Sequence, residues 1–238
     1  MAKTLRLITD FDGPIMDVSE RYYQVYQFCL AETKRPEQPV NLLTKAEFWQ
    51  LKRAYVPEQQ IGLISGLEPA QAKAFAQLRG RTVHTRPYLH YDTLAPGAVA
   101  ALERIHQSDV DLAVMTMRRV WQLEEAFNRY DLGRFFPEDR CYCLNNDHAK
   151  TGDVNDKPPL MERALAELPA ASQVWMVGDT EADITAARNY GIKVIAVLCG
   201  IRDRDQLKRH NPDLIVNDLG EAVDFVLGES LQETGSAA

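Results

Sequence analysis

The stretch Leu7-Ile-Thr-Asp10-Phe-Asp12-Gly13-Pro14 carries the strongest signal for the fold. An apolar run that begins at Leu5 leads directly into two aspartates one residue apart. Aspartate is a poor strand residue, so a pair of them at a strand end needs a physical reason. In open parallel sheets the carboxyl ends of the strands form the edge at which ligands bind. The alternative is a plain turn built by Gly13 and Pro14, and this stretch alone leaves both interpretations open.

The chain downstream of this stretch has the pattern of a parallel sheet. From about Thr93 to Leu227, short apolar or β-branched runs alternate with helical patterns, which is typical of strands joined by crossover helices. The expected strands are Leu5–Asp10, Asp111–Thr116, Cys141–Leu144, Val174–Gly178, Val194–Leu198 and Leu214–Val216, and the expected helices are Pro96–Gln107, Arg119–Tyr130, Pro159–Leu168 and Glu181–Tyr190. The pattern predicts an α/β fold with a Rossmann-like parallel sheet.

The interval between the first expected strand and the rest of the sheet is helical throughout. Ser19 is placed to cap a first helix, Thr44 and Glu47 form a capping box, and a helix from Pro69 to Arg79 is expected to end near Gly80. Insertions of this kind are tolerated where chain ends lie close together on a surface. We therefore expect an all-helical cap domain at residues 17–91, an α/β core formed by residues 1–16 and 92–228, and a disordered polar tail at 229–238.

A second pair of aspartates follows the expected strand Val174–Gly178. Asp179 comes directly after it, and Asp183 lies four residues on, one helical turn later. Singly, Asp179 could be a helix N-cap and Asp183 could favour the helix dipole. Four unpaired carboxylates at one sheet edge would repel one another, however, and a hard cation with oxygen ligands removes that conflict. The pattern favours Mg²⁺, the usual partner where phosphate is also present.

Two further residues are expected at the same edge. Thr116 ends a strand and offers a hydroxyl, and Lys157 precedes Pro158-Pro159 at the expected opening of a helix. A fixed ammonium there would hold a phosphoryl oxygen. The alternatives are an ordinary strand end for Thr116 and a solvated lysine for Lys157. Lys150 is a rival for the same role, without prolines to fix its position.

Together these pieces resemble the haloacid dehalogenase superfamily over nearly the whole chain. Its first motif, Asp-x-Asp-Gly after a strand, matches Asp10-Phe-Asp12-Gly13, and its second, a Ser or Thr that ends a strand, matches Thr116. Its third motif matches Lys157-Pro158, and its fourth matches Gly178-Asp179-Thr-Glu-Ala-Asp183. The helical insertion resembles the helical-cap subgroup, with phosphoglycolate-phosphatase-like members nearest. Pro14 departs from the usual Thr after the first motif, removes one backbone N–H and bears on the shape of the nucleophile loop.

The resemblance implies a Mg²⁺-dependent phosphatase. Asp10 would attack phosphorus to form an aspartyl-phosphate, and Asp12 would serve as general acid and then base. The metal would be held by Asp10, the carbonyl of Asp12 and Asp179, with support from Asp183. Expected catalytic residues are Asp10, Asp12, Thr116 and Lys157, and expected substrate contacts are Gly13, Thr116, Met117, Arg118 and Lys157. Dehalogenation is disfavoured, because relatives acting on carbon–halogen bonds lack the second aspartate.

Substrate choice is expected to come from the cap, since the core motifs recognise only the phosphate. The candidates are Lys52, Arg53, Arg79, Arg81 and His84, for each of which a solvated helix-surface charge is the favoured alternative. Arg118 and Arg119 lie nearer to the expected pocket. The polar loop from Asn145 to Asp156 either shapes the entrance or is mobile.

Composition limits the partners and leaves several competing functions. With a formal net charge of −7, the surface does not suit a nucleic-acid backbone. Without an apolar run of spanning length or a signal-peptide core, we expect a cytoplasmic protein that acts on a small phosphorylated metabolite and does not bind membranes. A phospho-accepting receiver module is disfavoured, since such modules are shorter and lack the helical insertion. A phosphomutase stays open, whereas a silent ligand-binding relative is disfavoured because the chemical residues are all present. Oligomeric state is left open.

Overall fold

The computed structural model describes the backbone of residues 5–235 and the side chains of residues 5–229. Within these residues, six parallel strands form one sheet in the order β5-β4-β1-β6-β7-β8. The predicted α/β class with a parallel sheet is confirmed. The strands are β1 (Leu5–Thr9), β4 (Asp111–Arg119), β5 (Cys141–Leu144), β6 (Gln173–Gly178), β7 (Lys193–Val197) and β8 (Leu214–Val216), and a short antiparallel pair is formed by β2 (Met16–Asp17) and β3 (Thr93–Leu94).

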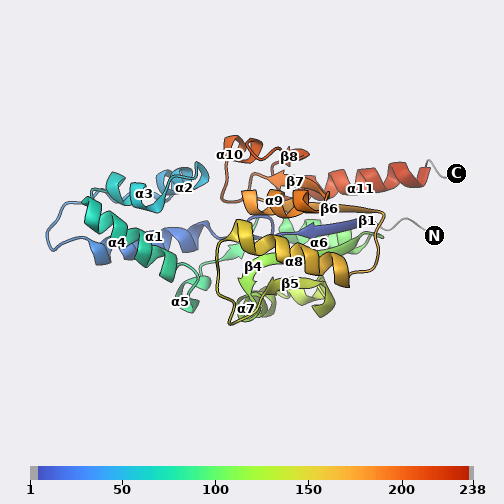
Figure 1. Cartoon of the computed structure of the whole chain (residues 1–238), viewed down its shortest axis with the longest axis horizontal. Helices are drawn as coiled ribbons and strands as arrows, with labels where there is room; N and C mark the ends of the chain where they lie inside the picture. The colour runs from blue at the N-terminus through green and yellow to red at the C-terminus, as the bar shows by residue number, and fades with distance from the viewer. Residues whose placement is uncertain (1–4, 236–238) are drawn as a thin grey trace.

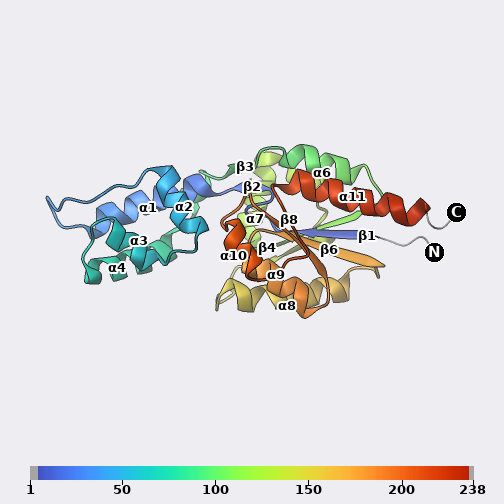
Figure 2. The same ribbon diagram turned by 90° about the horizontal axis from the view of Figure 1, so that it is seen from above.

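Helices cover both faces of this sheet, α6 and α11 on one face and α8 and α9 on the other (Figure 2). The helices of this part are α6 (Ala98–His106), α7 (Val120–Tyr130), α8 (Asp153–Glu167), α9 (Glu181–Asn189), α10 (Arg204–Lys208) and α11 (Leu219–Gly235), with 3₁₀ turns η1 (Leu132–Arg134) and η2 (Glu138–Arg140). No helix within residues 5–235 is long and apolar enough to cross a membrane.

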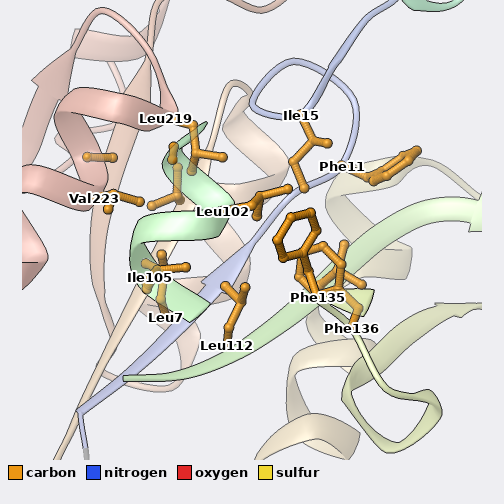
Figure 3. Close-up of a cluster of buried hydrophobic side chains, with 14 of the residues drawn as sticks. Leu7, Phe11, Ile15, Leu102, Ile105, Leu112, Phe135, Phe136, Leu219 and Val223 are labelled. Atoms are coloured by element: carbon orange, nitrogen blue, oxygen red, sulfur yellow. The ribbon is translucent and has the colours of Figure 1, made fainter. Parts of the chain in front are cut away.

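Alternation along the strands assigns side chains to the two apolar layers. Leu7 of β1 faces the cluster shared with Leu102 and Ile105 of α6 and with Val223 of α11 (Figure 3). The next residue, Ile8, points to the opposite cluster with α8 and α9. Both faces of the sheet are therefore buried, and the polar residues that follow the strands are left at the carboxyl edge.

The remaining helices form a separate block beside the sheet, displaced along the long axis of the molecule (Figure 1). It comprises α1 (Ser19–Thr33), α2 (Lys45–Arg53), α3 (Glu58–Ile64), α4 (Pro69–Thr82) and α5 (Arg86–Leu89). The block has its own apolar cluster, centred on Tyr26, Phe48 and Phe75. The rings of Tyr26 and Phe48 stack with their centroids 4.7 Å apart. This cluster gives the block a core that is independent of the sheet.

Besides the β2–β3 connection, several polar contacts join the block to the sheet, and one group of them involves residues 53–54. The guanidinium of Arg53 donates to the Leu198 carbonyl at 2.9 Å, and the Asp203 N–H donates to the Arg53 carbonyl at 3.0 Å. The Gln206 amide donates to the Ala54 carbonyl at 3.1 Å. We call these bonds between residues 53–54 and 198–206 the latch.

Several element boundaries differ from the sequence-based prediction. The N-cap of α1 is Val18, and Ser19 lies inside the helix. The helix expected to end near Gly80 continues to Thr82, because one exposed glycine costs a helix only about 1 kcal/mol. The capping box of Thr44 and Glu47 is confirmed.

Two corrections concern residues beside the ligand edge. β4 was expected to end at Thr116, but it continues to Arg119 after a register shift that follows Met115. α8 was expected to open at Pro159, but it begins at Asp153, so that both prolines lie inside the helix. At the C-terminus, α11 remains helical to Gly235 within the expected tail, whose residues 236–238 lie outside those that the structure describes.

Candidate active site

Asp10 lies directly beyond β1, where the chain leaves the sheet. Its N–H donates to the Val177 carbonyl at 2.7 Å and continues the contact with β6. One carboxylate oxygen, Oδ1, accepts the Phe11 N–H at 2.7 Å, and the residue is only 7% exposed. These contacts fix the carboxylate at the sheet edge, with Oδ2 directed to Lys157.

Two glycines are required by the close packing around Asp179 and Asp183. Gly13 has φ +95°, and a Cβ built on it would lie 2.5 Å from the Asp179 Cγ. A Cβ at Gly178 would lie 2.1 Å from the Asp183 Cγ. Since real Cβ atoms do not approach so closely, any larger residue would displace the carboxylates. Gly13, an expected substrate contact, therefore lets the loop after β1 pack against Asp179.

Asp10, Asp179 and Asp183 form a buried group whose ligand oxygens lie within 4.8 Å of one another. Burial raises the pKa of Asp10 well above its ordinary value; Lys157 opposes the shift, and Asp183 and Asp179 add to it. Burial, with repulsion from Asp183, raises the pKa of Asp179 to about 7. Bringing three carboxylates together in a buried site is unfavourable unless a cation compensates them. An all-oxygen donor set of this kind fits Mg²⁺.

Lys157 is the lysine that contacts the nucleophile candidate. Its Nζ lies 3.0 Å from the Asp10 Oδ2 and also pairs with the Asp183 Oδ1. Although burial alone would lower its pKa, Asp10 and Asp183 raise the pKa of Lys157 above its ordinary value, so the ammonium stays charged. The solvated-lysine interpretation is therefore wrong for Lys157. The rival Lys150 lines the cavity in front of the site.

Asp183 organises the loop after β6. Its Oδ2 accepts the N–H groups of Asp179 at 3.1 Å and Thr180 at 2.9 Å, and the Thr180 hydroxyl at 2.7 Å. Thr180, and not Asp179, is the N-cap of α9, with Asp183 at the third position of a capping box. Asp179 instead accepts the Ile201 N–H at 2.6 Å. Asp183 thus serves the helix and the site at once, and most of its lone pairs are already engaged.

Asp12 is held apart from this group by two arginines. Its carboxylate accepts Arg21 of α1 at 3.0 Å and the Arg118 Nε at 2.7 Å. Both arginines also pair with the buried Asp92 beside β3. Burial alone would raise the pKa of Asp12, but Arg118 and Arg21 outweigh it and lower the pKa below its ordinary value. Arg118, an expected substrate contact, lines the cavity while its guanidinium is bound to Asp12 and Asp92.

A cavity of about 520 Å³ opens between the sheet edge and the helical block. Thr116 and Met117 line it from β4, as do Lys52, Arg79 and His84 from the block. The solvated-charge interpretation is wrong for Lys52 and Arg79, whose side chains are only 11% and 9% exposed. Lining residues that the sequence did not indicate include Tyr22, Tyr55, Glu58 and Arg202. They belong to no motif, and only their positions in the fold reveal them.

The other candidate arginines have different places. Arg53 belongs to the latch. Arg81 is exposed on α4, as the favoured alternative predicted. Arg119 donates to the carbonyls of Asn145 at 3.1 Å and His148 at 2.9 Å. Arg119 therefore holds the loop before α8 and does not line the cavity.

Pro14 does not disturb the loop that carries the first aspartates. The N–H groups of Ile15 and Met16 donate to the Phe11 carbonyl at 3.1 and 2.9 Å, and the Gly13 N–H donates to the Met16 carbonyl at 2.8 Å. These bonds close the turn without an N–H at position 14. The departure at Pro14 is therefore compatible with an intact nucleophile loop.

This chain is similar in sequence to a known protein family and to several known proteins. A family model described as HAD-hydrolase-like matches residues 156–222, the segment that contains Lys157, Asp179 and Asp183. The chain is 25% identical over 149 residues to pyrophosphatase PpaX of Halalkalibacterium halodurans, covering 61% of this chain and 66% of that protein. It is 23% identical over 216 residues to a phosphoglycolate phosphatase of Pseudomonas syringae pv. tomato, covering 90% of this chain and 76% of that protein.

The fold is also found among solved structures. A protein of Clostridium difficile, provisionally assigned as a phosphatase, superposes with a TM-score of 0.71 at 19% sequence identity. The superposition covers 95% of this chain and all of that chain, 100%. At this identity the likeness concerns the fold, and it includes the helical block as well as the sheet.

Proposed function

This chain belongs to the haloacid dehalogenase superfamily, in its phosphoglycolate-phosphatase-like subgroup, and we propose that it is a Mg²⁺-dependent phosphatase with Asp10 as nucleophile. As a phosphoric monoester hydrolase it acts on small phosphorylated compounds. We further propose that residues 17–91 form its cap, that the substrate is a cytoplasmic metabolite, and that neither nucleic acid nor a membrane takes part. The observation that carries the proposal is Asp10, held by the Phe11 N–H beside Lys157, with the oxygens of Asp179 and Asp183 within 4.8 Å.

In the first step, a carboxylate oxygen of Asp10 attacks phosphorus, and the bond to the leaving oxygen breaks. Asp12 gives its proton to that oxygen. In the second step, Asp12 accepts a proton from water, the water oxygen bonds to phosphorus, and the Asp10 carboxylate is released. The two arginines keep Asp12 ionised, which is the form required in the second step. The first step requires protonated Asp12, and hence a weaker contact with Arg21 or Arg118.

The other residues hold charge and position. Mg²⁺, bound by Asp10, the Asp12 carbonyl and Asp179, would supply positive charge between the anionic nucleophile and the anionic phosphate. Asp183 would support this arrangement through its bonds to the Asp179 loop and to Lys157. Lys157 and Thr116 would hold the non-bridging phosphoryl oxygens. Gly13 keeps the two aspartate motifs close together.

The direct test is Mg²⁺-dependent phosphate release from a panel of small phosphate esters. We expect release by the wild-type chain that stops on chelation and in Asp10→Asn, while the fold, followed by circular dichroism, is retained. Asp153→Asn, which removes a different carboxylate of the cavity wall, is the matched control and should keep turnover. Phosphate release by Asp10→Asn near the wild-type rate would contradict the proposal. Transfer of phosphate between positions of a sugar, without release, would instead identify a mutase.

A further inference from the structure

Asp92 is a buried aspartate at the junction of the helical block and the sheet, and it belongs to no sequence motif. It directly precedes β3, where the chain returns from the block, and it is 1% exposed. Its carbonyl accepts the Tyr130 hydroxyl of α7 at 2.6 Å, and its N–H donates to the Leu89 carbonyl at 3.2 Å. The main chain at Asp92 is therefore attached to the core, which gives its carboxylate a defined position.

The carboxylate of Asp92 pairs with two arginines that come from different parts of the fold. Its Oδ1 lies 2.9 Å from the Nε of Arg21 in α1, and its Oδ2 accepts the Nη2 of Arg118 in β4. Both arginine side chains are almost fully buried. Burial raises the pKa of Asp92 to about 6 although both arginines oppose the shift, so this carboxylate is ionised at pH 8.

The same two arginines bind Asp12, the candidate for the acid and base. The Arg118 Nε and Nη2 both lie 2.7 Å from the Asp12 Oδ1, and the Arg21 Nη2 lies 3.0 Å from the Asp12 Oδ2. The Arg118 Nη2 is thus shared between Asp12 and Asp92. Among the described residues, Asp92 does not line the cavity. Its influence on the site therefore has to pass through the arginines.

Arg118 is the better oriented of the two connections. A guanidinium is planar, so holding its Nη2 on Asp92 also sets the direction of its Nε–H towards Asp12. The Phe11 ring lies over the same guanidinium, 4.9 Å from its central carbon. The pair between the Arg21 Nε and Asp92 is close but lacks the alignment of a hydrogen bond. The orientation of Asp12 is thus set mainly along the path from Asp92 through Arg118.

We propose that Asp92 is a positioning residue for the first step, in which it orients Arg118, and through Arg118 the Asp12 carboxyl group, towards the leaving oxygen of the substrate. The inference rests on the proposed function for the role of Asp12. Without the Asp92 carboxylate, both guanidiniums would turn to Asp12 as their one shared anion, because a buried cation without a partner is costly. Asp12 would then be held in a different direction.

The test compares two esters that differ in their need for a proton on the leaving oxygen. Ethyl phosphate would release a strongly basic alkoxide, whereas p-nitrophenyl phosphate releases a stable phenolate. The ratio kcat/KM covers the first phosphoryl transfer and leaves out the later attack of water. In Asp92→Asn at pH 8 and saturating Mg²⁺, we expect kcat/KM to fall about 10- to 100-fold for ethyl phosphate and less than about 3-fold for p-nitrophenyl phosphate. A general loss of folded protein would lower both values alike.

Two further variants connect the effect to Asp12 and to the position of the carboxylate. In an Asp12→Asn background, Asp92→Asn should change kcat/KM by less than about 2-fold, since a residue that acts through Asp12 has nothing left to position. This comparison can be made with any ester that the chain hydrolyses. Asp92→Glu keeps the charge but displaces the carboxylate, so kcat/KM for ethyl phosphate should fall by about 3- to 10-fold. It also serves as the test if Asp92→Asn does not fold.

Asp111→Asn is the matched control. Asp111 likewise pairs with two arginines, Arg6 at 2.7 Å and Arg140 at 2.9 Å, but it lies at the start of β4, at the opposite end of the strand from the site. Loss of its carboxylate should lower stability and leave the ratio of the two kcat/KM values as in the wild type. The control separates the loss of a buried ion pair from the loss of positioning.

The outcomes separate this inference from the proposed function. Equal losses on the two esters in Asp92→Asn, or the same loss with and without Asp12, would overturn the positioning role while the phosphatase stands. A wild-type chain that releases phosphate from neither ester nor any other compound of the panel would reject the phosphatase, and the positioning role with it.

Discussion

Lowering the pH from 8 to 6 should weaken Mg²⁺ binding about tenfold, because protonation of Asp179 competes with the metal. Burial and the neighbouring Asp183 raise the pKa of Asp179 to about 7. At pH 6 only about one Asp179 in ten is then ionised in the metal-free protein, whereas at pH 8 nearly all are. The pKa of Asp10 is also raised, so protonation of Asp10 competes with the metal as well and makes the pH dependence of Mg²⁺ affinity steeper.

The same protonation links stability to pH. The pKa of Asp179 is about 7 in the folded protein against 3.8 for an ordinary aspartate, so the folded state binds this proton more tightly than the unfolded chain. The contribution of Asp179 to the unfolding free energy is therefore full below about pH 4 and is lost as pH rises towards 7, by on the order of 4 kcal/mol. Mg²⁺ should offset that loss, and the rise in Tm on adding Mg²⁺ should be larger at pH 8 than at pH 6.

Calorimetric titration with Mg²⁺ in two buffers of different ionisation enthalpy counts the protons released on binding. We expect about one proton near pH 6 and few near pH 8. Asp183→Asn removes a neighbouring charge that raises the pKa of Asp179, so both the pH dependence and the proton release should shift to lower pH. An affinity that stays constant between pH 6 and 8 with no proton release would refute the reasoning.

Three substitutions test the frame of the site. Gly13→Ala should lower the unfolding free energy by about 1–3 kcal/mol in chemical denaturation and weaken Mg²⁺ binding, since the new Cβ meets Asp179; an unchanged Mg²⁺ affinity would contradict this. Lys157→Met should lower the unfolding free energy by about 3–5 kcal/mol near pH 8, because Asp10 and Asp183 lose their shared cation. Adding Mg²⁺ should restore part of this stability. A variant as stable as the wild type would show that the pairing contributes nothing to stability. Asp12→Asn should reduce kcat about 100-fold or more while Mg²⁺ still binds, and normal turnover would remove Asp12 from the acid–base role.

The sheet and its ligand edge could be predicted from sequence because the signals are local. An apolar run followed by Asp10, or by Gly178-Asp179, predicts both the strand and the position of its end within a few residues. The positions of these aspartates at one edge then follow from the parallel order of β1 and β6. The placement of these carboxylates therefore needed no tertiary information beyond the fold class.

Two features could not be predicted from the sequence: the partners of Asp12, and which residues of the helical block line the cavity. Both depend on contacts between residues that are distant in the chain. Arg21 and Arg118 meet Asp12 from a cap helix and from β4. Nothing in the local pattern distinguishes Arg79, which is buried, from Arg81, which is exposed two residues later. For charged residues on helices, the packing of the block decides which of them lines the cavity. The interior prolines of α8 were misjudged for a similar reason, since burial of Lys157 and Leu160 holds a helix that local propensity disfavours.

The latch has a consequence for how the enzyme could diverge. Its bonds from Arg53 to Leu198, from Asp203 to Arg53 and from Gln206 to Ala54 each involve at least one main-chain atom. Two of the donors are the side chains of Arg53 and Gln206, but neither residue lines the cavity. The side chains that line the cavity can therefore change while these bonds to the sheet remain. Mutation of residues that line the cavity can therefore alter what the site accepts while the latch is retained.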